Sequence, residues 1–73
     1  AFVPDRPYVY DKLTGEEFLR FSASLYGLRW ATVEPRAREL LELFELDAWR
    51  HELVEQYSHG MRQKLLLTAS VLH

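Results

Sequence analysis

Residues 57–65 read Tyr57-Ser58-His59-Gly60-Met61-Arg62-Gln63-Lys64-Leu65, and no charged side chain occurs from there to Leu72. A serine and a glycine before a helix place a hydroxyl and free backbone N–H groups on one side of the chain. The helix start adds a positive dipole end of about half a charge, so the stretch predicts an anion site, and phosphate is the usual biological anion there. We expect the helix to run from about Met61 to the end, with Arg62 and Lys64 strengthening the positive field. Without further context, a plain N-cap by Ser58 is the commoner meaning of this pattern.

Two amphipathic helices are predicted upstream of this stretch. The first begins with the capping-box spacing, with Thr14 as the N-cap and Glu17 three residues later. Gly27 provides its stop, because glycine adopts the left-handed conformation at low cost. Its apolar side is expected at i, i+3, i+4 and i+7, which selects Phe18, Phe21, Ser22 and Leu25.

The second helix is expected to begin near Glu34-Pro35, since proline is tolerated in a first turn. An apolar side repeats with the same spacing, and charges of alternating sign at i, i+4 indicate a solvated side. The apolar side consists of Ala37, Leu40, Leu41 and Phe44. The charged side consists of Glu34, Arg38 and Glu42. Asp47 is expected to cap a short helical turn over residues 48–50, ahead of the polar break at residues 58–60.

Length and composition fit one small all-α domain. The chain has 73 residues, of which 48% are hydrophobic and 27% charged, as in an ordinary globular protein. A chain this short buries only about 60% of its unfolded surface, so its stability margin is thin. We expect three to four helices, preceded by a strand stub at residues 1–3 and an irregular loop over residues 4–13, where two prolines favour extended geometry.

Several functional classes are disfavoured by the composition. A net charge of −2 argues against a nucleic-acid binder, which normally carries a basic face. No apolar run approaches the roughly 20 residues of a transmembrane helix. The chain has no cysteine, and His51, His59 and His73 do not share a helix face at metal-ligand spacing, so no metal site is predicted. No nucleophile, base and orienting group converge, so no catalytic residue is predicted within this chain.

The stretch at 57–65 resembles the signature motif of the ABC-type ATPases, usually Leu-Ser-Gly-Gly-Gln followed by a basic, glutamine-containing helix start. The serine, the second glycine and the basic continuation match, at Ser58, Gly60 and residues 62–64. Tyrosine replaces leucine, histidine replaces the first glycine and methionine replaces glutamine, at Tyr57, His59 and Met61.

The beginning of the chain resembles the same family. Phe2-Val3-Pro4-Asp5 is similar to the strand end and Q-loop, with Asp5 where glutamine is usual. Residues 10–14, followed by Glu17, Phe18 and Leu19, are similar to the stretch after the Q-loop. The resemblance therefore covers the chain from the Q-loop to the signature helix, in the family's order and spacing. As a residue beside Pro4, Asp5 also fits a simple turn former.

This resemblance implies that residues 1–73 are the helical (signature) subdomain of an ABC transporter ATP-binding subunit, without the phosphate loop (Walker A) and the Asp-Glu strand (Walker B) of the core. In this family two subunits dimerise head to tail, and each ATP with its Mg²⁺ lies between one subunit's phosphate loop and the other's signature motif. The implied contacts with the partner's ATP are Ser58, His59, Gly60 and Met61, with the Ser58 hydroxyl and the Gly60 N–H donating to the γ-phosphate.

At the Q-loop position, the resemblance implies that Asp5 and Arg6 couple ATP hydrolysis to a transmembrane permease subunit. It further implies a location at the cytoplasmic face of the cell membrane, held there through the permease. The chain by itself is not expected to hydrolyse ATP, because it supplies only one wall of the active site.

Two other functions are compatible with parts of the sequence. A free-standing helical interaction module is the main alternative, with the uncharged last helix binding a partner. A helix-turn-helix DNA binder is disfavoured by the acidic balance. Neither end carries a start or stop pattern typical of a complete protein, so we expect a segment of a longer one. Within the ATPase interpretation, a protein without membrane partners is a further option.

Overall fold

The structure is a computed structural model that describes residues 10–72. It contains the α-helices α2 (Gly15–Leu25), α3 (Trp30–Leu43) and α4 (His59–Val71), with short 3-10 turns η1 (Asp47–Trp49) and η2 (Val54–Gln56) between α3 and α4. No sheet occurs in this part of the chain, so the predicted all-α class is confirmed. The predicted strand stub, Asp5 and Arg6 lie outside the described residues.

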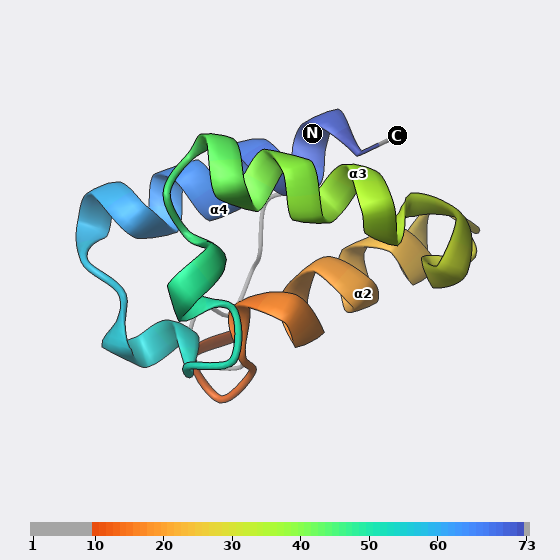
Figure 1. Ribbon diagram of the computed structural model, residues 1–73. Helices are drawn as coiled ribbons and strands as arrows, with labels where there is room; N and C mark the ends of the chain where they lie inside the picture. Colours follow the sequence, from red (N-terminus) through yellow and green to blue (C-terminus); the bar gives the residue numbers. More distant parts are fainter. Residues whose placement is uncertain (1–9, 73) are drawn as a thin grey trace.

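The three helices pack against one another in pairs around a single core (Figure 1). Each helix contributes one buried side, and the two 3-10 turns and the residues beside them close the core at the end where α4 begins. The buried hydrophobic residues are Phe18, Leu19, Ala23, Val33, Ala37, Leu41, Leu46, Val54, Tyr57, Leu65, Ala69 and Leu72. No helix within residues 10–72 has the length and apolar character needed to cross a membrane.

Helix α2 begins as predicted. The Glu17 N–H donates to Thr14 Oγ1 at 3.1 Å, and the Thr14 N–H donates to Glu17 Oε1 at 2.8 Å, which completes the capping box. The helix ends before Gly27, whose φ is +72°, and the Leu28 N–H donates to the Ala23 carbonyl at 2.9 Å. This is the Schellman arrangement that a C-terminal glycine favours.

The predicted apolar side of α2 is only half right. Phe18 and Ser22 are buried, but Phe21 and Leu25 are 41% and 53% exposed. Leu19 and Ala23 occupy the core in their place. The buried stripe is rotated because it must meet both α3 and α4, so it runs along i, i+1, i+4 and i+5 from Phe18.

Helix α3 starts earlier than predicted. Its first residue is Trp30, with Arg29 as the N-cap, and Pro35 lies inside the helix. The prediction of a start near Glu34-Pro35 is therefore wrong. Proline removes one backbone donor there, but Pro35 is exposed, whereas burial of Val33 on the first turns favours the longer helix.

Helix α3 and its C-cap, Phe44, are followed by a residue in an unusual conformation. Glu45 has a φ of +61°, while the Leu46 N–H donates to the Leu41 carbonyl at 2.7 Å and the Glu45 N–H to the Glu42 carbonyl at 3.1 Å. This is again a Schellman ending, built here without glycine. Leu46 is pulled into the core by it and is buried.

The segment between α3 and α4 differs from the prediction in its cap. Asp47 is the first residue of η1 and not its cap, since Leu46 holds that position without a side-chain bond. The Asp47 carboxylate instead lies 3.6 Å from Arg50 Nη1. The short helical turn itself is present, over residues 47–49.

The same segment is hydrogen-bonded to the residues that precede and open α2, as Figure 1 shows where the two chain parts lie side by side. The Val54 N–H donates to the Leu13 carbonyl at 2.8 Å, the Gly15 N–H to the Glu52 carbonyl at 3.2 Å and the Glu16 N–H to the Arg50 carbonyl at 2.9 Å. Thr14 and Leu53 form an isolated antiparallel bridge. Tyr10 and Asp11 are helical, so the end of the predicted irregular loop is more ordered than expected.

Candidate anion site at the start of helix α4

Helix α4 begins with Ser58 as its N-cap. Ser58 Oγ accepts a hydrogen bond from the Met61 N–H at 3.2 Å. The helix therefore starts at His59, two residues before the predicted start at Met61, because the Ser58 side chain caps the Met61 N–H of the first turn. The hydroxyl proton of Ser58 is not used in this bond and can be donated to an anion.

Two backbone donors stay open in the first turn. The N–H of Met61 is used by Ser58 Oγ, and the N–H of Arg62 donates to the Ser58 carbonyl at 2.9 Å. The N–H groups of His59 and Gly60 lie at the very start of the helix, where no earlier helical carbonyl is available to accept from them. Ser58, His59 and Gly60 are all exposed. Three donors and the positive helix end thus face solvent together, as an anion site requires.

Gly60 is not required by the packing of this chain. A Cβ atom built on it meets nothing within 4 Å, and its φ is not in the positive range. The open space leaves its backbone accessible to a ligand that approaches from outside. Met61 differs from its neighbours, since its side chain packs against the core. The structure therefore brings Ser58, His59 and Gly60 to the surface and turns the Met61 side chain inward.

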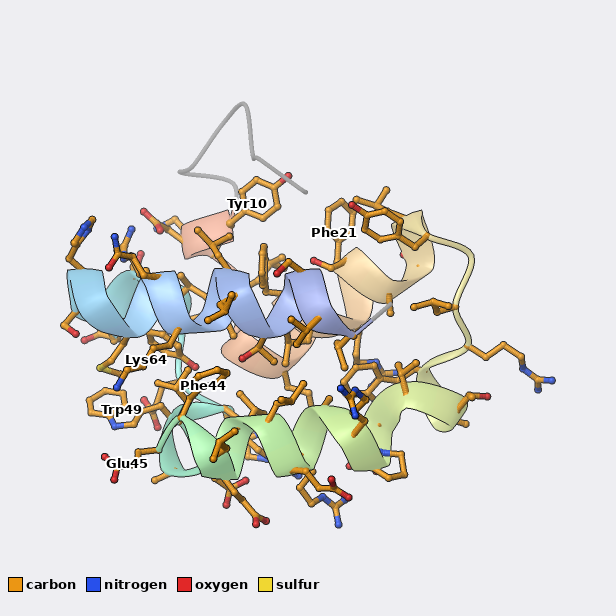
Figure 2. The ribbon with its side chains drawn as sticks, turned by 90° about the horizontal axis from the view of Figure 1, so that it is seen from above. Tyr10, Phe21, Phe44, Glu45, Trp49 and Lys64 are labelled. Atoms are coloured by element: carbon orange, nitrogen blue, oxygen red, sulfur yellow. The ribbon has the colours of Figure 1, made fainter. Side chains whose placement is uncertain are left out.

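Arg62 does not point toward the exposed donors. Its guanidinium is held by Asp11, with Arg62 Nη1 3.0 Å from Asp11 Oδ1. The positive field that we expected from Arg62 is therefore largely balanced by a neighbouring carboxylate. Lys64 is exposed. In Figure 2, Tyr10 and Phe21 project on one side of α4 and Phe44 and Trp49 on the other.

The amino-acid sequence of the chain is similar to those of known proteins of one family. Over 72 residues, or 99% of its length, the chain is 39% identical to the uncharacterized ABC transporter ATP-binding protein YthP of Bacillus subtilis. It is 35% identical over all 73 residues to YxlF of the same organism, and 41% identical over 64 residues, 88% of the chain, to the daunorubicin/doxorubicin resistance ATP-binding protein DrrA of Streptomyces peucetius. The chain belongs to the ABC transporter ATP-binding proteins.

The similarity concerns one part of each relative. The chain spans 30% of the length of YthP, 25% of YxlF and 19% of DrrA. No protein-family model matches the sequence. The family assignment therefore rests on these relatives, and it confirms the resemblance on which the sequence analysis relied.

Tyr57, which directly precedes Ser58, is held in the core. Tyr57 is 5% exposed, and its hydroxyl donates to the Trp49 carbonyl. Its ring meets the Trp49 ring edge to face at 6.0 Å between centroids. Burial, together with the nearby Glu52 carboxylate, raises the pKa of Tyr57 to about 12, although a hydrogen bond from the Gly15 backbone acts in the opposite direction.

Gly15, the first residue of α2, lies directly beside the Tyr57 hydroxyl. A Cβ atom on Gly15 would lie 2.1 Å from the Tyr57 hydroxyl oxygen and 3.1 Å from Cζ. Glycine at the start of α2 thus makes room for a tyrosine that lies directly before Ser58. Sequence analysis did not identify this pair, because the two residues are distant in sequence and neither carries a local signal for the other.

The described residues offer no ready metal site. Within residues 10–72, no group of three or more His, Cys, Asp or Glu side chains could hold a metal ion. Asp5, at the position that the family resemblance aligns with the Q-loop, lies outside the described residues. The exposed donors at residues 58–60 and the positive end of α4 support the binding of an anion.

Proposed function

We propose that this chain is the helical subdomain of an ABC transporter ATP-binding subunit, and that the start of α4 contacts the γ-phosphate of ATP bound to a second such subunit. The observation that supports this most directly is the exposed group of donors formed by the Ser58 hydroxyl and the backbone N–H groups of His59 and Gly60. In the whole protein, ATP hydrolysis would occur at the partner's phosphate loop, and this chain would complete the site.

The energetic contribution of such contacts can be bounded. A hydrogen bond to a charged group contributes roughly 1.5–3 kcal/mol. Loss of the Ser58 contact would therefore weaken ATP-driven closure of the dimer by about tenfold or more. The helix dipole adds about 0.3–1 kcal/mol at an exposed site. These contacts form only when the two subunits close, so they favour the closed dimer over the open one.

The remaining parts of the proposal concern the whole protein. Asp5 and Arg6 would lie in the Q-loop and couple the Mg²⁺–ATP state to a transmembrane permease subunit through its coupling helix. The protein would then lie at the cytoplasmic face of the membrane, held by the permease. The chain alone would neither bind nor hydrolyse ATP, because its donors form only one side of the nucleotide site.

The test uses the full-length ATP-binding protein and two variants of Ser58 that separate capping from phosphate binding. Ser58→Ala removes both the hydroxyl and the N-cap. Ser58→Asp preserves a good N-cap but places a carboxylate against the phosphate. We expect both variants to weaken ATP-induced dimerisation by at least about tenfold, with Ser58→Asp the weaker dimer although the more stable fold.

The matched control is Ser24→Ala, since Ser24 is an exposed serine on α2 whose Oγ donates to the Phe21 carbonyl at 2.8 Å. We expect it to leave dimerisation unchanged. Dimerisation would be measured by sedimentation with a slowly hydrolysed ATP analogue. Dimerisation of Ser58→Asp at the native level would refute a phosphate contact at this position.

The interaction-module alternative has one observation in its favour. Leu66, Leu67 and Val71 of α4 are partly exposed, and Leu67 is 50% exposed. The similarity to ATP-binding proteins extends over nearly the whole chain, however. A free-standing module would not account for that similarity, so the ATPase subdomain is the better supported function.

A further inference from the structure

The side chain of Arg62 contacts three residues in two parts of the chain. Its Nη1 lies 3.0 Å from Asp11 Oδ1, its Nε donates to the Tyr57 carbonyl at 3.4 Å and its Nη2 to the Glu55 carbonyl at 3.5 Å. The side chains of Arg62 and Asp11 are 36% and 27% exposed. The pair is thus partly shielded, and a planar guanidinium can satisfy all three acceptors at once.

These contacts hold both peptide groups next to Ser58. The Arg62 side chain donates to the carbonyl of Tyr57, which precedes Ser58, and the Arg62 backbone N–H donates to the carbonyl of Ser58 itself at 2.9 Å. Ser58 has extended geometry, with φ of −68° and ψ of 167°. One residue therefore restrains the peptide planes on both sides of the N-cap, and with them the direction of the Ser58 hydroxyl.

Asp11 keeps the guanidinium in this position. Without an opposite charge, a long arginine side chain beside an anion site could turn toward the anion. The segment that carries Asp11 is itself fixed, because the Leu13 carbonyl accepts a backbone hydrogen bond from the Val54 N–H at 2.8 Å. The carboxylate is thus presented from a part of the chain that is hydrogen-bonded to the residues preceding the site.

We infer that Arg62, held by Asp11, is a positioning residue for the phosphate contact of Ser58 and is not itself a phosphate ligand. This inference rests on the proposed function of Ser58. The two possible roles of Arg62 predict opposite effects of removing the Asp11 charge. A positioning residue loses its restraint and binding weakens, whereas a phosphate ligand is released and binding strengthens.

The experiment uses the full-length ATP-binding protein with Asp11→Asn, Arg62→Lys and Arg62→Gln. Lys12→Gln is the matched control, because it removes the neighbouring ion pair on the same segment, with a lysine that is 76% exposed. ATP-induced dimerisation, ATP binding by the monomer and the thermal midpoint are measured for each variant. The monomer measurement is included because the partner's phosphate contact does not contribute to it.

We expect Asp11→Asn and Arg62→Lys to weaken dimerisation by about three- to tenfold, which is the range for a partly exposed charged contact. Arg62→Gln should weaken it at least as much. Monomer affinity for ATP and the Lys12→Gln dimer should stay within about twofold of the native protein. Asp11→Glu, which keeps the charge, should recover most of the dimerisation and guards against a simple folding defect in Asp11→Asn.

Each contrary outcome has a distinct meaning. Stronger dimerisation of Asp11→Asn would make Arg62 a phosphate ligand and overturn the inference. Native dimerisation of Asp11→Asn, together with a clear loss for Ser58→Asp, would also overturn it while leaving the proposed function intact. A loss that only parallels the fall in thermal midpoint, without recovery by Asp11→Glu, would reduce the pair to a structural contact. Native dimerisation of Ser58→Asp would remove the proposed function itself.

Discussion

Replacing Gly15 with alanine should break the packing that holds the residue before the candidate site. The added Cβ would lie 2.1 Å from the Tyr57 hydroxyl oxygen, far inside van der Waals contact, so either the tyrosine or the start of α2 must move. We expect the tyrosine side chain to move, because the Gly15 backbone is held by the hydrogen bond from its N–H to the Glu52 carbonyl. Its movement would break the bond to the Trp49 carbonyl and the edge-to-face contact with the Trp49 ring.

The cost follows from these contacts. An unsatisfied buried hydroxyl costs about 1–3 kcal/mol, and the aromatic pair contributes about 0.5–1.5 kcal/mol. Alanine is a better helix former than glycine by up to about 1 kcal/mol, which offsets part of the loss. We expect a net destabilisation of roughly 2–3 kcal/mol, or a fall in thermal midpoint of about 10–20 °C for a domain of this size.

A double-mutant cycle with Tyr57→Leu isolates the contact. Leucine is the residue of the family motif at this position and lacks the ring that meets the alanine. Gly15→Ala should therefore cost little in the Tyr57→Leu background, giving a coupling of about 2 kcal/mol in urea or thermal unfolding. If the two substitutions are additive within about 0.5 kcal/mol, the proposed contact does not determine the stability of this region.

Two further predictions concern backbone strain and alkaline pH. Glu45→Gly should stabilise the fold by about 0.5 kcal/mol in urea unfolding, because it relieves a φ of +61°. Gly27→Ala should destabilise the fold by about 1–2 kcal/mol, because Gly27 has a φ of +72° although the space around it is open. A change of the opposite sign at either position would contradict the strain assignment. The pKa of Tyr57 is raised from 10.0 to about 12 in the folded chain. The neutral tyrosine therefore contributes fully to the free energy of unfolding below pH 10, and this contribution, roughly 2–3 kcal/mol, is lost as the pH rises through 12. Tyr57→Phe should not lose this stability at alkaline pH. If the free energy of unfolding of both proteins depends on pH in the same way, ionisation of Tyr57 is not the cause of the loss.

Local signals in the sequence predicted much of this fold. The Thr14–Glu17 capping box and the stop at Gly27 are formed by residues close in sequence, and both are confirmed. The start of α3 was missed because Pro35 is a permitted helix start, and only burial of Val33 against the other helices shows that the helix begins before it. Propensity near a proline does not carry that tertiary information.

The candidate site was predicted less completely than the helices. The role of Ser58 as an N-cap follows from a local pattern, and the structure adds the bond to the Met61 N–H. The Arg62–Asp11 pair and the contact of Tyr57 with Gly15 join residues about 40 or 50 positions apart. No periodicity or motif in one sequence specifies such pairs, since they depend on how the segment after α3 returns to the start of α2.

The edge-to-face pair of Trp49 and Tyr57 gives the chain an internal optical probe. Trp49 is 39% exposed, so its indole emission is sensitive to the polarity around it, and it contacts the residue directly before Ser58. The other tryptophan of these 73 residues, Trp30, lies on α3 with the Arg20 guanidinium 5.7 Å from its ring centroid, and Trp30→Phe would leave Trp49 as the single tryptophan within them. Stopped-flow fluorescence of that variant could then follow nucleotide-driven rearrangement at this end of the subdomain in real time, without an attached dye.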